Sequence, residues 1–199
     1  MGASPVPAAA PLDDPPGYPG QFECRLKTHT GTTVSVRPIR PDDARRLVAF
    51  HQSLSPRTVY MRFFSPHPKL TEREVHRFTH VDYADRLALI AELEGDLVGV
   101  ARYDRLAGTT EAEVAFVVAD NWQHHGIAAE LLELLARAAW LCGIDTFTAA
   151  TLPDNRDMLH VFRHSRFDVT THVGGGVVEV RFPIVPSYHS SAEGGTARC

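Results

Sequence analysis

One stretch of the sequence combines acidic side chains with a small-residue turn, a pattern that could bind an anion and move a proton. Residues 111–118 read as a strand, a polar turn follows, and a helical pattern begins near Gly126. Gly126, Ala128 and Ala129 are small enough to let a ligand approach the backbone closely. The first N–H groups of a helix lack internal partners and carry the positive dipole end, so such a turn can bind pyrophosphate. The same spacing fits an ordinary strand, turn and helix equally well.

Two glutamates on this strand are candidates for proton transfer. Glu111 and Glu113 lie two residues apart, so both project from the same face. A carboxylate placed beside a reacting amine, or acting through water, can take up its proton. The ordinary alternative is that both are solvated side chains near a strand start, which is the usual position of glutamate.

The elements that must hold these residues follow from the periodicity of the chain. The segment 126–142 has the apolar stripe of a helix packed on a sheet, and Gly143 follows as a stop. A capping box formed by Thr71 and Glu74 opens another helix. We predict strands over residues 22–28, 32–40, 86–93, 97–103, 111–118, 146–151, 167–172 and 177–182, and helices over 41–54, 55–64, 71–79, 126–142 and 154–164. This pattern indicates a mixed α/β domain.

Composition and charge exclude several functional classes. The 199 residues carry 20 Lys+Arg and 24 Asp+Glu, a formal charge of −4 that argues against a nucleic-acid or membrane-surface footprint. No run of apolar residues is long enough to cross a membrane, and residues 1–20 lack the features of a signal peptide. The three cysteines show no metal-type spacing and suit a reducing compartment. We therefore expect a cytoplasmic protein.

The chain divides into one folded domain and two loose ends. The Pro/Ala-rich segment 1–20 and the polar, Gly-rich segment 187–199 are predicted to be disordered. Residues 21–186 form the predicted domain. The eleven histidines include two pairs at i,i+4 spacing, but no third ligand or HExxH pattern accompanies them, so no metal site is predicted.

The turn and a downstream asparagine resemble a known family. Gln123-His-His-Gly126-Ile-Ala128 is similar to the Gln/Arg-x-x-Gly-x-Gly/Ala loop of the GNAT N-acetyltransferases, and Asn155-Arg-Asp-Met158 resembles their Asn-x-x-Met/Ala segment. The motif Arg37-Pro-Ile-Arg-Pro-Asp-Asp and residues 55–64 look most like the acetyltransferase domain of bacterial Pat-type protein lysine acetyltransferases. The resemblance implies the GNAT fold, a twisted, mostly antiparallel mixed sheet flanked by helices.

The resemblance also implies acetyl-CoA as co-substrate and assigns the site. By this likeness Glu113 is the general base, with Glu111 as second choice, and the N–H of Val117 stabilises the oxyanion. The implied cofactor-binding residues are Phe116, Val117, Val118, Gln123, His124, His125, Gly126, Ile127, Ala128, Ala129, Asn155 and Phe162.

Three departures from the family pattern affect these assignments. His124 and His125 replace the usual Gly and Arg, a change that a loop acting through backbone amides tolerates. Phe162 stands where many relatives have a tyrosine that protonates the leaving thiolate, so the general acid is unassigned. Arg166 replaces a usual glycine before the last strand pair.

The resulting hypothesis is an acetyl-CoA-dependent N-acetyltransferase that acts on a protein lysine by direct transfer. The alternatives are a small-molecule amine acceptor and a CoA-binding regulatory module without turnover. The segment with Tyr60, Arg62, Phe63 and Phe64 either lines the acceptor pocket or supplies aromatic core, and the sequence favours neither.

Overall fold

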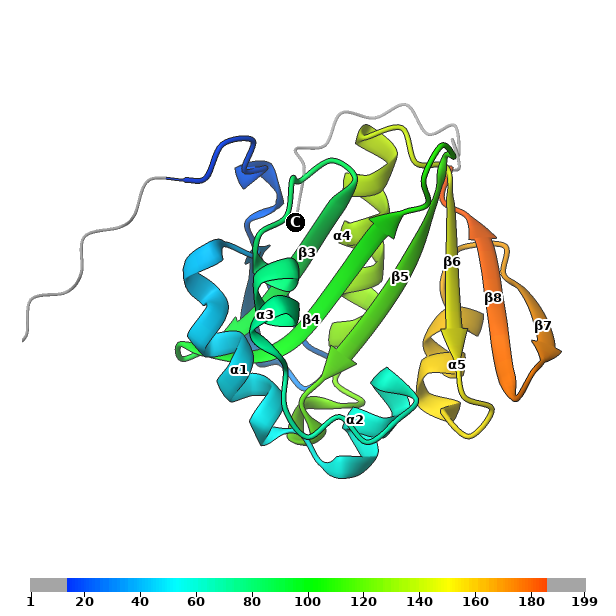
Figure 1. Ribbon diagram of the computed structural model, residues 1–199, viewed down its shortest axis with the longest axis horizontal. Coiled ribbons are helices and arrows are strands. Elements are labelled where there is room, and N and C mark those ends of the chain that lie inside the picture. Colours follow the sequence, from blue (N-terminus) through cyan, green and yellow to red (C-terminus); the bar gives the residue numbers. More distant parts are fainter. Residues whose placement is uncertain (1–13, 186–199) are drawn as a thin grey trace, which may run out of the picture.

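The computed structural model describes residues 14–185, which form a sheet covered by helices on both faces (Figure 1). The strands are β1 (Cys24–Lys27), β2 (Thr33–Pro38), β3 (Arg86–Leu93), β4 (Asp96–Arg105), β5 (Glu111–Val118), β6 (Thr146–Thr151), β7 (Thr170–Gly174) and β8 (Val177–Pro183). The helices are α1 (Ala44–Ser53), α2 (Pro56–Phe63), α3 (Glu72–Thr79), α4 (Ile127–Leu141) and α5 (Arg156–Arg163). Short 3₁₀ turns lie at Gly20–Phe22, Pro41–Asp43 and Asp120–Trp122.

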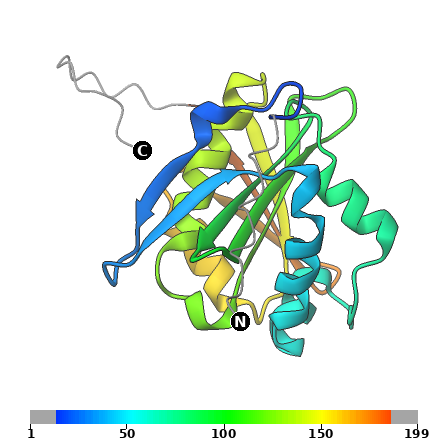
Figure 2. The ribbon, with the colours of Figure 1, turned by 90° about the vertical axis from the view of Figure 1, so that its left-hand side faces the viewer.

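The strands form one eight-stranded sheet in the order β1-β2-β3-β4-β5-β6-β8-β7. All neighbours are antiparallel except β5 and β6, which are parallel. Helices α1, α2 and α3 lie on one face of the sheet, and α4 and α5 lie on the other (Figures 1 and 2). The predicted mixed, mostly antiparallel sheet flanked by helices is thus confirmed.

Strand β5 lies between the two halves of the core, because its side chains alternate between the two faces of the sheet. Val114, Phe116 and Val118 are buried in the cluster that contains α4, whereas Val117 packs against the cluster under α1. Because successive side chains of a strand point to opposite faces, Glu111 and Glu113 share the face of Val117. Both glutamates therefore lie on the side of α1–α3.

Strands β5 and β6 pair only at their beginnings. The parallel register joins residues 111–113 of β5 to residues 146–148 of β6 and is not continued further along either strand. In Figure 1 the two strands spread apart toward the end at which α2 and α5 lie. An opening in the sheet therefore begins halfway along β5.

Several local predictions are confirmed, and others are shifted by tertiary contacts. Thr71 and Glu74 form the predicted capping box of α3. Strand β7 begins at Thr170 rather than at 167, because Phe167 instead stacks on Phe182 with ring centroids 5.3 Å apart.

The ends of the chain are only partly described. Residues 1–13 and 186–199 lie outside the described part, so the predictions of loose ends there stand untested. Within the segment predicted to be disordered, however, Tyr18 packs edge-on against Tyr83, and the Arg40 guanidinium lies 4.3 Å from the Tyr18 ring centroid. The ordered chain therefore begins before residue 21, because Tyr18 contacts residues that are distant from it in the sequence.

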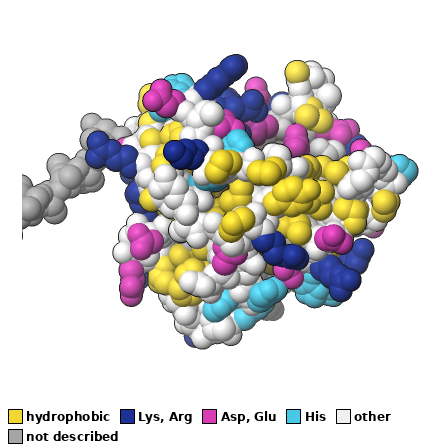
Figure 3. All heavy atoms as spheres, turned by 60° about the horizontal axis from the view of Figure 1, so that its bottom comes forward, with side chains coloured by type: hydrophobic (Ala, Val, Ile, Leu, Met, Phe, Trp, Pro, Cys, Tyr) yellow, Lys and Arg dark blue, Asp and Glu magenta, His cyan; other side chains and the backbone are white. Residues whose placement is uncertain are grey.

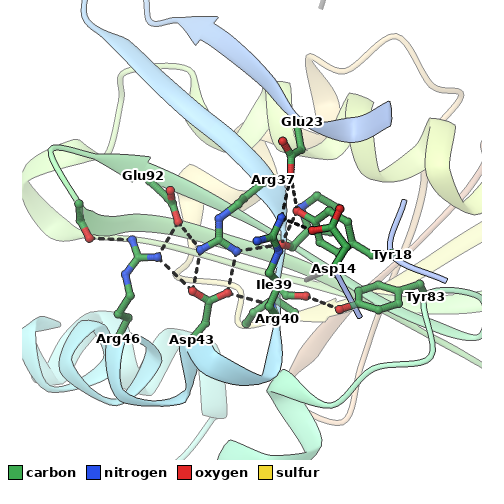
Figure 4. Close-up of polar contacts among 12 residues, drawn as sticks. Asp14, Tyr18, Glu23, Arg37, Ile39, Arg40, Asp43, Arg46, Tyr83 and Glu92 are labelled. Carbon is green, nitrogen blue, oxygen red and sulfur yellow. Dashed lines mark hydrogen bonds and ion pairs between the residues drawn. The ribbon is translucent and has the colours of Figure 1, made fainter. Parts of the chain in front are cut away.

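A network of charged side chains fixes the start of α1 against the sheet (Figure 4). The Arg37 guanidinium donates two hydrogen bonds, of 2.8 and 2.7 Å, to the Asp43 carboxylate. Arg46 donates to both Asp43 (3.0 Å) and Glu92 (2.7 Å), and Arg37 also pairs with Glu92 at 2.7 Å. Arg37 belongs to β2 and Glu92 to β3, so the network joins two strands to one helix.

Candidate active site

A cleft of about 780 Å³ lies at the end of β5, where β5 and β6 are no longer paired. Its walls come from the end of β5, the turn before α4, the first turn of α4, helix α2 and helix α5. Figure 3 shows the end of the molecule near α2 and α5, where a band of hydrophobic side chains lies beside histidine, lysine and arginine side chains. The cleft is therefore a mixed surface that suits a ligand with both apolar and anionic parts.

The turn before α4 has the geometry of an anion cradle. Gly126 has φ of +87° and caps α4 without a side chain, and His124 also has a positive φ of 64°. The first N–H groups of α4 therefore lack a side-chain acceptor and remain for a ligand. A Cβ on Gly126 would lie 2.7 Å from Nε2 of His29, so the His29 ring would have to move, and the left-handed backbone there also favours glycine. These features fit a pyrophosphate group.

The same turn is anchored to α2 through Asp120. The Asp120 carboxylate accepts hydrogen bonds from the N–H of Ser55 (2.9 Å), from the Ser55 hydroxyl (2.6 Å) and from the Thr58 hydroxyl (2.7 Å). Burial raises the pKa of Asp120, but these hydrogen bonds outweigh burial and lower it below 3.8. Gln123 donates to the Thr58 hydroxyl (3.2 Å) and to the carbonyl of Val118 (3.1 Å). The Gln123 side chain therefore holds the turn together.

The pairing of β5 decides which backbone N–H groups face the cleft. The N–H of Ala119 donates to Val98 and the carbonyl of Glu111 accepts from Leu106, both on the β4 side. The β4–β5 register is continuous, so the N–H groups of the odd-numbered residues between them also point toward β4. The N–H of Val118 points into the opening instead. The N–H of Val117, which was expected to donate to an oxyanion, therefore points toward β4 and not into the opening.

Most of the predicted cofactor-binding residues come together in the cleft. All line it except His125 and Phe162. The His125 ring is hydrogen-bonded through Nδ1 to Thr30 at 3.0 Å, and Phe162 is 1% exposed in the core. Phe162 packs on Phe116 and Phe182, so its ring fills the core in place of contacting a ligand.

Asn155 sits on the far wall of the cleft as the N-cap of α5. Its Oδ1 accepts a hydrogen bond of 3.2 Å from the N–H of Met158, which leaves its amide N–H groups for other partners. Arg166 lies away from the cleft, where it pairs with Glu133 of α4 at 2.6 Å. The position that is usually glycine therefore carries an ion pair to α4 in this chain.

The two candidate bases have different environments. The Glu111 carboxylate is held by Arg181 at 2.6 Å. Glu113 is exposed, and in the described part of the chain no hydrogen bond or ion pair engages its carboxylate. Its charge acts on Arg62: burial and the charge of Arg102 lower the pKa of Arg62 to about 10, while Glu113 opposes that shift. Of the two glutamates, Glu113 is available for chemistry.

Several cleft residues were not predicted from the sequence. His29 comes from the β1–β2 turn, Arg57 from α2 and Arg156 from α5. Each is distant in sequence from the loop motif, and an isolated surface arginine carries no local signal. Arg57 and Arg156 bring positive charge to the α2 and α5 walls of the cleft, which Asp120, Asp154 and Asp157 also line.

The histidine pairs form ring stacks. The rings of His160 and His164 stack with centroids 3.8 Å apart, as do those of His76 and His80 at 3.9 Å. Among the described residues no group of three or more His, Cys, Asp or Glu side chains could hold a metal ion. Nor does any helix between residues 14 and 185 have the length and apolar character to cross a membrane.

Comparison with known proteins agrees with this geometry. A family model described as "Acetyltransferase (GNAT) domain" matches residues 34–168. The chain is 32% identical over 164 residues to the acetyltransferase Pat of Mycolicibacterium smegmatis, a match that covers 80% of this chain and 49% of that protein. It is 29% identical over 132 residues to the acetyltransferase PA5475 of Pseudomonas aeruginosa, covering 64% of this chain and 71% of that protein.

A solved structure shows the same likeness in three dimensions. The GNAT domain of S. lividans PAT superposes with a TM-score of 0.79 at 41% identity, covering 83% of this chain and 99% of that domain. The chain spans about half the length of the M. smegmatis relative, so the likeness concerns the domain.

Proposed function

The chain belongs to the GNAT acetyltransferase family, and we propose that it transfers an acetyl group from acetyl-CoA to the ε-amine of a protein lysine. The observation that carries this proposal is the uncapped α4 N-terminus, with Gly126 at φ +87°, opening into the cleft between β5 and β6. A cleft of this kind fits a pyrophosphate at the helix and a narrow chain between the strands.

In this proposal, different residues of the cleft bind different parts of acetyl-CoA. The N–H groups of Ile127, Ala128 and Ala129 take the pyrophosphate, and Arg57 and Arg156 pair with its remaining charge. The carbonyl and N–H groups at the end of β5 take the pantetheine arm in place of a strand partner. Asn155 contributes its amide N–H groups from α5.

Glu113 is proposed as the general base. A lysine ammonium has a pKa near 10.4, so deprotonation before attack costs about 4–5 kcal/mol at pH 7. A carboxylate that accepts the proton as the amine attacks removes part of that cost. The thioester would lie near Val117, which is four residues beyond Glu113 and roughly 13 Å along the strand. The proton therefore travels from the amine to Glu113 through intervening water.

The N–H of Val118 is proposed to stabilise the oxygen of the thioester carbonyl as negative charge develops on it. No side chain is assigned to protonate the sulfur, since Phe162 is buried. A thiolate of pKa about 8.5, by analogy with cysteine, leaves adequately without one.

The protein-lysine acceptor is favoured over a small amine by the openness of the acceptor side. Glu113 is exposed, and Tyr60 and Phe64 on the neighbouring α2 segment are 45% and 37% exposed. Such an unenclosed surface with exposed aromatic rings suits a macromolecular acceptor better than a small molecule, which needs an enclosing pocket. The resemblance to Pat-type enzymes points the same way.

The experiment offers a lysine-bearing protein mixture and a panel of small amines separately, with acetyl-CoA. Mass spectrometry of the products and the release of free thiol are followed together. We expect thiol release that depends on the protein, with acetyl groups on lysine side chains. Acetylation of small amines alone would instead support a small-molecule amine N-acetyltransferase. Binding of acetyl-CoA with no release on either acceptor would instead support a regulatory module.

A further inference from the structure

A second, smaller cavity lies beside the cleft, between helices α1–α3 and the sheet. Its volume is about 40 Å³. The walls are almost entirely apolar, with three polar side chains, His51, Arg62 and Arg102, among them. The apolar lining residues include Phe63, Phe78, Ala88, Val100 and Val117.

The cavity adjoins the place where a thioester would react. Arg62 and Val117 line both the cavity and the cleft, so the two hollows adjoin at these residues. The Val117 side chain points to the cavity side of the sheet, while the N–H of the next residue, Val118, faces the cleft. An acyl group whose carbonyl bonds to Val118 therefore has this cavity next to its chain.

One buried side chain in the cavity lacks hydrogen-bond partners. His51 is 5% exposed, and neither Nδ1 nor Nε2 has a hydrogen-bond partner among the described residues. Burial, and then the charge of His67, lower the pKa of His51 against the opposing charge of Glu74, which favours the neutral ring with one donor and one acceptor. A buried polar group without a partner is costly, which makes a ligand hydroxyl at this position favourable.

We propose that this cavity receives the chain of an acyl group longer than acetyl, and that His51 hydrogen-bonds a hydroxyl on that chain. The inference rests on the proposed transferase function. A cavity of about 10–15 Å³ holds one water molecule, so this cavity takes about three non-hydrogen atoms. A 3-hydroxybutyryl group has three more non-hydrogen atoms than an acetyl group.

The chemistry of transfer is the same as for acetyl. The thioester C–S bond breaks, a bond forms between the acyl carbon and the amine nitrogen, the amine proton passes through water to Glu113, and the sulfur leaves as a thiolate. Only the group attached to the acyl carbon differs.

The walls favour an uncharged chain over an acidic one. Arg102 is already hydrogen-bonded to Asp104 at 3.0 and 2.5 Å, and its guanidinium lies over Phe78. The charges of Glu113 and Asp104 already act on Arg62, the other cation in the wall. Apart from Arg62 and His51 the remaining surface is hydrocarbon, where a carboxylate is expensive to desolvate. Malonyl-CoA adds the same number of non-hydrogen atoms as 3-hydroxybutyryl-CoA, so it serves as the charged comparison.

The test measures the affinity of the 199-residue chain for acetyl-, propionyl-, butyryl-, 3-hydroxybutyryl- and malonyl-CoA by calorimetry, which needs no acceptor. We expect affinity to rise about fourfold for each added methylene up to butyryl. The 3-hydroxybutyryl thioester should bind at least as well as butyryl, and malonyl-CoA more weakly than either.

Two variants separate the roles of the cavity and of His51. His51→Leu should lower the preference for 3-hydroxybutyryl over butyryl about tenfold, because the ligand hydroxyl then lacks a partner. Ala88→Val narrows the cavity and should abolish the gain from longer chains while acetyl-CoA still binds. Ala101→Val is the matched control, since Ala101 is an equally buried sheet alanine in the other core cluster.

The outcomes distinguish this inference from the proposed function. Normal binding of acetyl-CoA with falling affinity for longer chains would overturn the inference alone, as would tighter binding of malonyl-CoA than of butyryl-CoA. An unchanged hydroxyl preference in a folded His51→Leu protein would overturn the role of His51. Absence of binding by every thioester would overturn both proposals.

Discussion

At the scale of single residues, the pairing of the strands decides roles that the sequence pattern leaves open. Glu111 and Glu113 look equivalent in the sequence, but Arg181 holds the first and leaves the second exposed. The contact with Arg181 comes from a strand 70 positions away, which no local pattern reveals. The same is true of the shift from Val117 to Val118 as the N–H that faces the cleft, because it depends on the register with β4.

The first prediction concerns the base. Glu113→Gln should lower the rate of acetyl transfer by about 10²–10⁴-fold, because the amide cannot accept the amine proton. The dissociation constant for acetyl-CoA should stay the same, since Glu113 does not line the cleft. Steady-state turnover and calorimetry measure the two quantities.

Glu111→Gln is the matched control. It lies on the same face of the same strand, and its turnover should stay within a few-fold of the wild type. Equal losses in both variants would mean that Glu113 has no special part in proton transfer.

At the scale of elements, the start of α4 is the feature on which cofactor binding depends. Its helix is predicted well from the sequence, because a long apolar stripe reports burial on a sheet. The contact of the β1–β2 turn with the α4 turn is not predictable in this way. The N–H of His29 donates to the carbonyl of His125 at 3.1 Å, a contact that joins segments with no common sequence signal.

The second prediction concerns the two glycines that flank α4. Gly126→Ala should weaken acetyl-CoA binding at least tenfold, because its Cβ would displace His29 and reshape the cradle. It should also lower the free energy of unfolding by about 1–2 kcal/mol, the cost of a left-handed residue with a side chain.

Gly143→Ala supplies the control, since Gly143 also has a positive φ, of 76°, with nothing within 4 Å of the added Cβ. It should share the loss of stability and keep full affinity for acetyl-CoA. Calorimetry and denaturant unfolding test both variants. Similar affinity in the two proteins would show that the turn at Gly126 does not form the cradle.

At the scale of the whole molecule, the charged network of Arg37, Asp43, Arg46 and Glu92 joins the sheet to α1, one of the helices that cover the acceptor side. Burial raises the pKa of Asp43, but hydrogen bonds from Arg37 and from the N–H of Arg40 and the charges of Arg37 and Arg46 hold it below 3.8. An ionised Asp43 therefore stabilises the fold.

The third prediction is that Asp43→Asn lowers the free energy of unfolding by about 2 kcal/mol at pH 7, because the half-buried guanidinium groups of Arg37 and Arg46 then lose one of their two carboxylate partners and keep Glu92. A carboxyl whose folded-state pKa is depressed contributes above its unfolded pKa, and the contribution is lost as pH falls through the folded pKa. Denaturant unfolding at pH 7 and near pH 3 should thus show a smaller difference between wild type and variant at the lower pH. A difference that does not change with pH would contradict the role of Asp43 ionisation.

Across the whole molecule, the sequence was a good guide to elements and a poorer one to their contacts. Periodicity predicted β5, β6 and α4 because each buries one face. The packing of Tyr18 and Phe162, and the positions of Arg57 and Arg156, depend on residues distant in the chain. Those positions therefore became visible only in the fold.

The most direct test of this account is a calorimetric titration of the 199-residue chain with acetyl-CoA. We predict one site per chain with a dissociation constant between about 1 μM and 1 mM, the usual range for enzyme substrates. Free CoA should compete for the same site, because the pyrophosphate cradle at the start of α4 acts on both molecules. A titration without binding up to millimolar acetyl-CoA would contradict the assignment of the cleft between β5 and β6.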